Sequence, residues 1–94
     1  MAYTVRYHHL VKSEDIPKLD NTVKTRIKKA IETRLTAAPE EYGEPLRRTL
    51  KGYWKLRVGD YRVVFKVEGD DIIVLGIRHR RDIYKVMSGE RTGL

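Results

Sequence analysis

The hydrophobic residues follow one spacing near the N-terminus and another in the segment after it. Tyr3, Val5 and Tyr7 alternate with polar residues, which is the period of a half-buried strand. From Leu19 to Ala38 the apolar residues recur at intervals of three and four, with lysines and arginines between them. These intervals predict a long amphipathic helix whose apolar side packs on a sheet.

Residues at both ends of this helix mark its limits. Asp20 or Asn21 can cap the first turn, because short polar side chains accept hydrogen bonds from the unpaired N–H groups there. Pro39 disfavours helical dihedrals at the residue before it and so ends the helix. A shorter helical turn is predicted just upstream, around residues Ser13 to Pro17, and the two segments form a helical hairpin.

Three strands are predicted in the second half of the chain, over Trp54–Val58, Tyr61–Glu68 and Ile72–Arg78. The short breaks between them, Gly59-Asp60 and Gly69-Asp70-Asp71, are typical of hairpin turns, so the strands form an antiparallel meander. The third strand is apolar at almost every position, which is typical of a central strand covered on both faces.

A final short helix is predicted to begin near Asp82. Its apolar and aromatic residues are Ile83, Tyr84, Val86 and Met87. The order of elements predicts an α+β fold, in which an N-terminal strand and a helical hairpin precede the meander and the last helix. With 94 residues there is room for one hydrophobic core, so we expect a single domain over residues 1–94.

A two-residue loop at Gly59-Asp60 also fixes the register of the first hairpin. The predicted pairs are Val58–Tyr61, Arg57–Arg62, Leu56–Val63, Lys55–Val64 and Trp54–Phe65. Lys55, Arg57 and Arg62 then crowd together on one face, and the apolar residues occupy the other. Like charges opposed across a sheet cost roughly 0.2–1 kcal/mol. An anion bound between these cations would replace their repulsion by attraction, so the hairpin pattern predicts a phosphate site.

The distribution of charge supports a polyanionic partner. The net charge is +7, and the first 45 residues hold eight basic and seven acidic side chains, whereas the remainder hold twelve and six. At the end of the last predicted strand, Arg78, His79, Arg80 and Arg81 are consecutive. We therefore expect two basic groups to converge in the C-terminal half, where they would bind the backbone of RNA.

The composition also argues against several classes of protein. There is no cysteine, which excludes disulfides and Cys-based zinc sites. A cationic site with few carboxylates does not suit magnesium or calcium, so no metal and no other cofactor is expected. No segment approaches the roughly 20 apolar residues of a membrane span, and the N-terminus lacks a long apolar signal core. We expect a cytoplasmic protein.

The segments LKGYWKLRVGDYRVVFKV and IVLGIRHRRDIY resemble the RelE/ParE superfamily of toxins from type II toxin–antitoxin systems. The resemblance covers nearly the whole chain, includes the order of elements, and is closer to the RelE branch. It implies the RelE-like fold and a ribosome-dependent endoribonuclease, or mRNA interferase, that inhibits translation. The partners that it implies are the ribosome, mRNA and a cognate antitoxin.

Such an enzyme cleaves mRNA in the ribosomal A site, without metal, by attack of a ribose 2′-OH on the adjacent phosphate. Carried over by position, the catalytic residues are Lys55, Arg62, Arg80 and Tyr84, and the RNA-binding residues are Arg57, Arg78, His79 and Arg81. The resemblance implies that Lys55 activates or orients the 2′-OH and that Arg62 stabilises the phosphoryl oxygens. Arg80 would act near the leaving 5′-oxygen, Tyr84 would orient or stack on a base, and His79 is the alternative proton donor.

One position departs from the best-known RelE pattern, which has two lysines where this chain has Tyr53 and Lys55. The identity of the general base is therefore left open. Two other functions share the same features. One is a ParE-like inhibitor of DNA gyrase that has no catalytic activity, and the other is an RNA-binding module that does not cleave.

Overall fold

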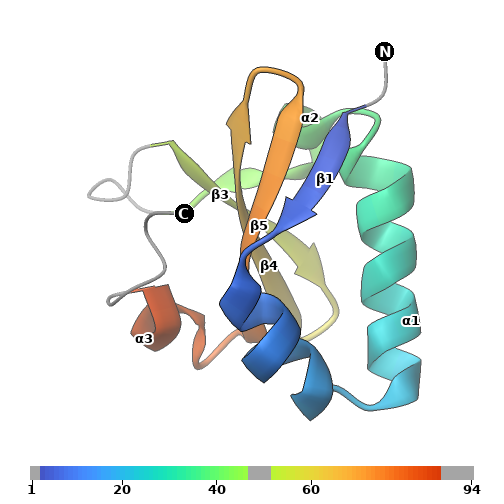
Figure 1. Cartoon of the computed structure of the whole chain (residues 1–94), viewed down its shortest axis with the longest axis vertical. Helices are drawn as coiled ribbons and strands as arrows, with labels where there is room; N and C mark the ends of the chain where they lie inside the picture. The colour runs from blue at the N-terminus through green and yellow to red at the C-terminus, as the bar shows by residue number, and fades with distance from the viewer. Residues whose placement is uncertain (1–2, 47–51, 88–94) are drawn as a thin grey trace.

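A computed structural model describes residues 3–46 and 52–87, which form a five-stranded sheet with helices on both of its faces (Figure 1). The sheet order is β1-β5-β4-β3-β2. Helix α1, Asn21–Ala30, lies on one side of the sheet, and the short α3, Ile83–Met87, lies on the other. The predicted α+β class is confirmed.

The three C-terminal strands form the predicted antiparallel meander. They are β3 (Tyr53–Val58), β4 (Tyr61–Glu68) and β5 (Asp71–His79). The N-terminal strand β1 (Thr4–Tyr7) pairs with β5 in parallel, so β5 is central, as its apolar sequence predicts. A two-residue strand, β2 (Glu44–Pro45), extends the opposite edge and was not predicted.

Both hairpin turns contain two residues. Gly59 and Gly69 have φ angles of +60° and +61°, which glycine adopts without the steric cost that a side chain brings. The first turn agrees with the prediction. The second was predicted one residue too long, because Asp71 already pairs with Glu68 and belongs to β5.

The helical hairpin begins with two short turns, η1 (Val11–Asp15) and η2 (Ile16–Lys18), and continues through α1 into η3 (Ile31–Leu35). The carboxylate of Asp20 accepts a hydrogen bond from the Val23 N–H at 2.8 Å and so caps α1 as predicted. The long helix ends at η3, three residues before Ala38. Pro39 instead begins α2, Pro39–Tyr42.

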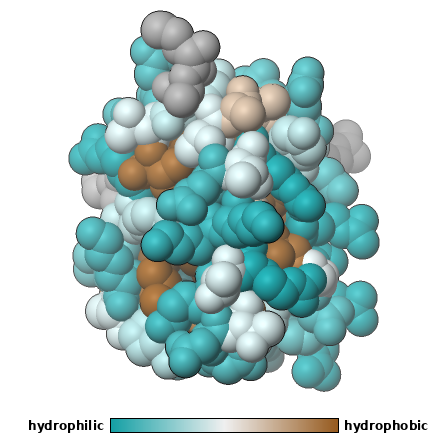
Figure 2. Space-filling view, turned by 90° about the vertical axis from the view of Figure 1, so that its right-hand side faces the viewer, coloured by the Kyte–Doolittle hydropathy of each residue, from teal (hydrophilic) through white to brown (hydrophobic). Residues whose placement is uncertain are grey.

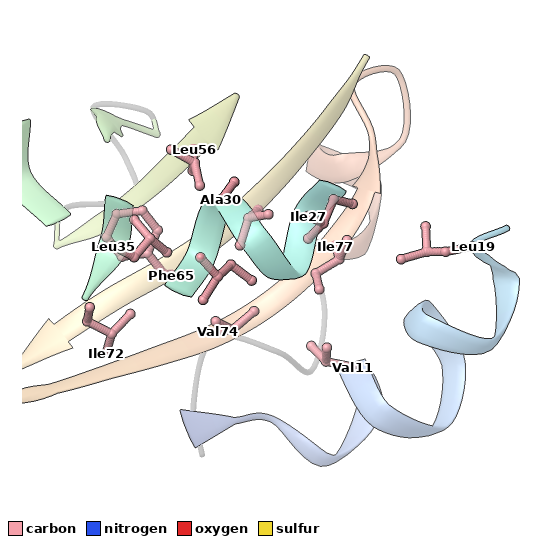
Figure 3. Close-up of a cluster of buried hydrophobic side chains, with 12 residues drawn as sticks. Val11, Leu19, Ile27, Ala30, Leu35, Leu56, Phe65, Ile72, Val74 and Ile77 are labelled. Carbon is pink, nitrogen blue, oxygen red and sulfur yellow. The ribbon is translucent and has the colours of Figure 1, made fainter. Parts of the chain in front are cut away.

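The main core lies between α1–η3 and the sheet (Figure 3). Its side chains come from both layers and are Val11, Leu19, Ile27, Ala30, Ile31, Leu35, Leu56, Val63, Phe65, Ile72, Val74 and Ile77. The members from α1 and η3 are among those that the three-and-four spacing predicts, whereas Val11 of η1 was not predicted. Because a fully buried side chain of this size contributes about 1.5–3 kcal/mol, this cluster is the main source of stability. It holds β3, β4 and β5 in a fixed register beneath the helix.

Candidate functional site

The register of the sheet aligns three arginines in one row across the meander. Arg57 opposes Arg62 and Arg62 opposes Arg78, and residues opposed in this way share a face of the sheet. In the next row of the same face, Lys55 opposes Val64. All five predicted pairs of the first hairpin are present, so the predicted register is confirmed. The face lies opposite the main core.

Apolar side chains cover part of this face and form a second cluster. Its buried members are Leu46, Val64, Ile73, Leu75 and Ile83. Ile83 comes from α3, and the partly buried Tyr53 and Tyr84 pack against the cluster. The basic residues of the first hairpin therefore share this face with apolar residues of β4, β5 and α3. Helix α3 forms a wall beside Lys55.

Lys55 and Tyr84 meet at this wall. The Lys55 Nζ donates a hydrogen bond to the Tyr84 hydroxyl oxygen at 3.3 Å and lies 5.8 Å from the ring centroid. The hydroxyl in turn donates to the Leu46 carbonyl at 2.9 Å. An ammonium group has three N–H donors, so Lys55 has two others for a substrate oxygen. The structure thus brings together two of the four predicted catalytic residues.

Arg62 is buried, with 8% of its surface exposed. Its Nη1 donates hydrogen bonds to the carbonyls of Gly59, at 3.0 Å, and Tyr61, at 2.8 Å. These bonds fix the turn between β3 and β4. Arg57 instead lies 3.8 Å from the Glu44 carboxylate, and both of these side chains are exposed. Although the two arginines are opposed in the sheet, each therefore has a different acceptor.

Arg78, predicted to bind RNA, is engaged by carboxylates of η1. Its Nε donates to one oxygen of Asp15 at 2.8 Å, and its Nη2 lies 3.8 Å from Glu14. Asp15 is fully buried, and its second oxygen accepts from the Ile77 N–H at 2.9 Å. The Asp15 carboxylate thus satisfies the Ile77 N–H beyond the end of β1, and its two contacts tie η1 to β5. The charge of Arg78 is largely compensated by this contact.

The residues after Arg78 bring the end of β5 to the first hairpin turn. The Arg80 N–H donates to the Asp60 carbonyl at 2.8 Å, so the two basic segments lie next to each other. His79 accepts from the Arg81 N–H at 3.2 Å through Nδ1 and packs edge-on against Tyr61, with ring centroids 5.8 Å apart. The side chains of Arg80 and Arg81 are exposed.

Sequence reasoning missed two groups on which this arrangement depends. Asp15 lies 62 residues before Ile77 in the chain and has no motif around it that signals a buried carboxylate. The Leu46 carbonyl is a backbone acceptor and carries no side-chain signal at all. Within residues 3–46 and 52–87, no three histidine, aspartate or glutamate side chains gather in a way that could hold a metal ion. In the same part of the chain, no helix is long and apolar enough to span a membrane.

Comparison with known proteins decides the family. Residues 5–84 match the family model described as the ParE toxin of the type II toxin–antitoxin system, parDE. The chain belongs to this toxin family. It is also 31% identical over 87 residues to toxin RelG of Mycobacterium tuberculosis, an alignment that covers 90% of this chain and 99% of RelG. The predicted membership of the RelE/ParE superfamily is thus confirmed.

Solved structures of RelE toxins have the same fold as this toxin. The toxin–antitoxin complex RelBE2 of Mycobacterium tuberculosis matches with a TM-score of 0.78 and 28% identity, over 85% of this chain and all of that chain. A mutant of Escherichia coli toxin RelE in the free state matches with a TM-score of 0.72 and 24% identity, over 94% and 93% of the two chains. The fold of this toxin is therefore the RelE fold.

Proposed function

We propose that this toxin is a ribosome-dependent endoribonuclease that cleaves mRNA without a metal ion. The observation that carries the proposal is the contact between the Lys55 Nζ and the Tyr84 hydroxyl, 3.3 Å apart. These two residues come from β3 and α3 and were selected as catalytic from the sequence. Their polar groups lie beside a buried apolar cluster. A substrate oxygen bound there would contact the Lys55 ammonium group and lie next to the Tyr84 ring.

In the proposed reaction, the ribose 2′-oxygen forms a bond to phosphorus, and the bond from phosphorus to the 5′-oxygen breaks. The 2′-OH loses a proton and the leaving oxygen gains one. Lys55 donates hydrogen bonds to the 2′-oxygen or to a phosphoryl oxygen, and Tyr84 orients the adjacent base. Arg80, exposed at the end of β5, stabilises the leaving oxygen.

The contribution of Arg62 follows from its hydrogen bonds. Because Nη1 is engaged by the turn carbonyls, only Nε and Nη2 remain to act on a phosphoryl oxygen. Its burial limits direct contact with RNA, so its first effect is to fix the turn that carries Arg57 and Asp60. The exposed Arg57 and Arg81 are the cations with freer access to the backbone of the RNA.

The partners that we propose are the ribosome, mRNA and a cognate antitoxin, all in the cytoplasm. An antitoxin is supported by the complexes in which related toxins were solved, among them the RelB–RelE complex from Methanococcus jannaschii. An antitoxin that lies over Lys55 would cover the site, and one that moves α3 would separate Lys55 from Tyr84. Either would inhibit the proposed cleavage at the same contact.

Induction of the toxin in cells tests this function directly. The 5′ ends of mRNA are mapped while incorporation of amino acids and of deoxynucleosides is measured. The proposal requires new 5′ ends in translated frames and an early loss of translation. The Lys55→Ala variant should yield neither, whereas Lys28→Ala, on the exposed side of α1, should behave as the wild type. Absence of new 5′ ends with the wild type would rule out cleavage.

A second function is favoured by one observation, which is that the matching family model carries the ParE description. A ParE-like toxin would block DNA gyrase by protein contact. The same experiment separates the two, because arrest of DNA synthesis with intact mRNA would identify a gyrase inhibitor. Reduced translation with intact mRNA would instead identify an RNA-binding module that does not cleave.

A further inference from the structure

A hollow of about 350 Å³ lies between α1–η3 and the end of β3, and neither Lys55 nor Tyr84 lines it. Eight residues line it, and they are Arg26, Lys29, Ala30, Thr33, Arg34, Arg57, Val58 and Gly59. Four of the eight are cations. Figure 2 looks onto the side of the molecule that carries α1, which is mainly hydrophilic with smaller hydrophobic patches between the side chains. We call this hollow the cationic groove.

The helical cations of the groove form a line. Arg26, Lys29 and Arg34, together with Ala30 and Thr33, follow the spacing of residues on one side of a helix. With a rise of about 1.5 Å per residue, Arg26 and Arg34 are about 12 Å apart along the axis. A row of charges of this length matches a polymer with a repeated negative charge better than it matches a single small anion.

These three cations have no ion-pair partner among the residues that the structure describes, in contrast to Arg57, which is near Glu44. Arg26 is packed against the hairpin turn, where its Nη2 lies 3.2 Å from the point at which Gly59 would carry a Cβ. The absence of a side chain at Gly59 thus allows a guanidinium to sit over the turn. Three uncompensated positive charges within one groove repel each other, and an anion bound there would relieve that repulsion.

The groove continues toward two aromatic rings. An adjoining hollow shares Arg26 and Val58 with it and is also lined by Tyr61 and Asp60. Tyr61 lines a third hollow as well, whose other polar residues are the basic Lys18, Arg78 and His79 and the acidic Asp15 and Asp82. The carboxylates lie beside the aromatic rings and not in the cationic groove, so the phosphates belong in the groove and a base belongs at the rings. Base stacking on aromatic rings next to a positively charged track is the usual means of binding single-stranded nucleic acid. The path therefore offers both of the required features, charge and then stacking.

We propose that the cationic groove binds the phosphates of single-stranded RNA, with Tyr61 and His79 as the adjacent platform for a base. An acidic polypeptide would be attracted by the same charges, but only Ala30 and Val58 offer apolar contact in the groove, which leaves no pocket to anchor a peptide. Guanidinium groups, by contrast, bind phosphate oxygens in bidentate fashion. This site goes beyond the proposed cleavage, because binding here requires neither Lys55 nor Tyr84.

The test compares two variants of the full chain that each lose three positive charges from the net +7. The groove variant is Arg26→Gln/Lys29→Gln/Arg34→Gln. The control variant is Lys12→Gln/Lys24→Gln/Lys28→Gln, whose lysines line a mainly apolar hollow on the other flank of α1. Binding of a fluorescent 20-nucleotide RNA is measured by anisotropy over a range of salt concentrations.

The groove variant should bind RNA roughly tenfold or more weakly than the control variant. The slope of log affinity against log salt should also be smaller in magnitude by about 2, which is about 0.7 for each of three lost phosphate contacts. The RNA is isolated and no ribosome is present, so failure of the proposed ribosome-dependent cleavage leaves this result unaffected. Circular dichroism checks the fold. If the triple variant does not fold, Lys29→Gln alone should lower the slope by about 0.7.

Three results would overturn the site. They are failure of the wild type to bind RNA, equal loss of affinity in the two triple variants, and displacement of RNA from the wild type by polyglutamate at a lower charge concentration than by unlabelled RNA. The second result would mean that only total charge matters. The third would mean that the groove accepts an acidic polypeptide.

Discussion

Lys55 and Tyr84 are 29 residues apart in the chain, and the lysine Nζ lies 3.3 Å from the tyrosine hydroxyl oxygen. The hydroxyl is also bound to the Leu46 carbonyl, so a single oxygen connects β3, α3 and the segment after β2. The position of the Lys55 ammonium group therefore depends on α3. Lys55 would therefore act on the substrate directly, whereas the Tyr84 hydroxyl would act by holding Lys55 in position.

Lys55→Ala should lower the rate of mRNA cleavage by roughly 10²–10³-fold, because it removes a preorganised charge from the reacting phosphate. Tyr84→Phe keeps the ring but frees Lys55 and the Leu46 carbonyl, so its rate should fall by less. Single-turnover cleavage on programmed ribosomes measures both. Equal rates for Lys55→Ala and the wild type would contradict the assignment of Lys55.

Arg62→Ala should lower the free energy of unfolding by about 1.5–3 kcal/mol, the usual worth of hydrogen bonds made by a charged group. The turn carbonyls of Gly59 and Tyr61 would lose their donor. The matched control is Arg57→Ala across the same hairpin, where an exposed ion pair with Glu44 is lost at a cost of less than about 1 kcal/mol. Urea denaturation compares them, and a similar loss in both would show that Arg62 does not fix the turn.

Asp15→Asn should destabilise the fold by about 3 kcal/mol. Arg78 loses its buried anionic partner, and the new amide NH2, which is a donor, faces either the Ile77 N–H or the Arg78 Nε, which are donors too. In a domain of this size, that loss lowers the melting temperature by roughly 10 °C or more. Asp71→Asn breaks the exposed pair with Arg6 and serves as the control, with little change expected. Calorimetry that finds equal melting temperatures for the two variants would contradict a structural role for the Asp15–Arg78 pair.

Stability should fall at alkaline pH because of Tyr7. Burial, and to a lesser extent the charge of Glu32, raise the pKa of the Tyr7 hydroxyl above its ordinary value of 10.0. As pH rises past that value, the unfolded chain releases this proton and the folded chain retains it, so unfolding becomes more favourable until the folded pKa is reached. Denaturation between pH 9 and about 11 measures the decline.

Tyr7→Phe removes the group that titrates, so the decline above pH 10 should become shallower than in the wild type. Glu32→Gln should produce a smaller change of the same sign, because it removes only the lesser of the two causes. A decline of unchanged steepness in Tyr7→Phe would assign the alkaline loss of stability to other groups.

The local parts of the fold follow from the sequence because short-range rules determine them. The two-residue turn at Gly59 fixes the register of β3 and β4, and the three-and-four spacing identifies the buried side of α1. Asp20 caps this helix because its carboxylate is in reach of the Val23 N–H, three residues away. Each of these relations involves residues close together in the chain.

The candidate site was predicted less fully, since its contacts join distant segments. The hairpin pattern assigns Arg62 to the correct face, but it does not show that the guanidinium folds back onto the turn. The pairing of Arg78 with Asp15 spans 63 residues and leaves no periodic signal. The cationic groove is also hidden in the sequence, because the charges of the first half nearly balance. In the structure the acidic residues of that half do not line the groove, so Arg26, Lys29 and Arg34 lie together without them.

The parallel pairing of β1 with β5 joins the first and the last of the strands in residues 3–46 and 52–87. During synthesis the N-terminal strand emerges early but has no partner until residues 71–79 have been made, so this pairing has a high contact order and forms late. The Lys55–Tyr84 contact also awaits the synthesis of α3. A nascent chain that has completed only β1, α1 and the meander therefore still lacks the assembled site.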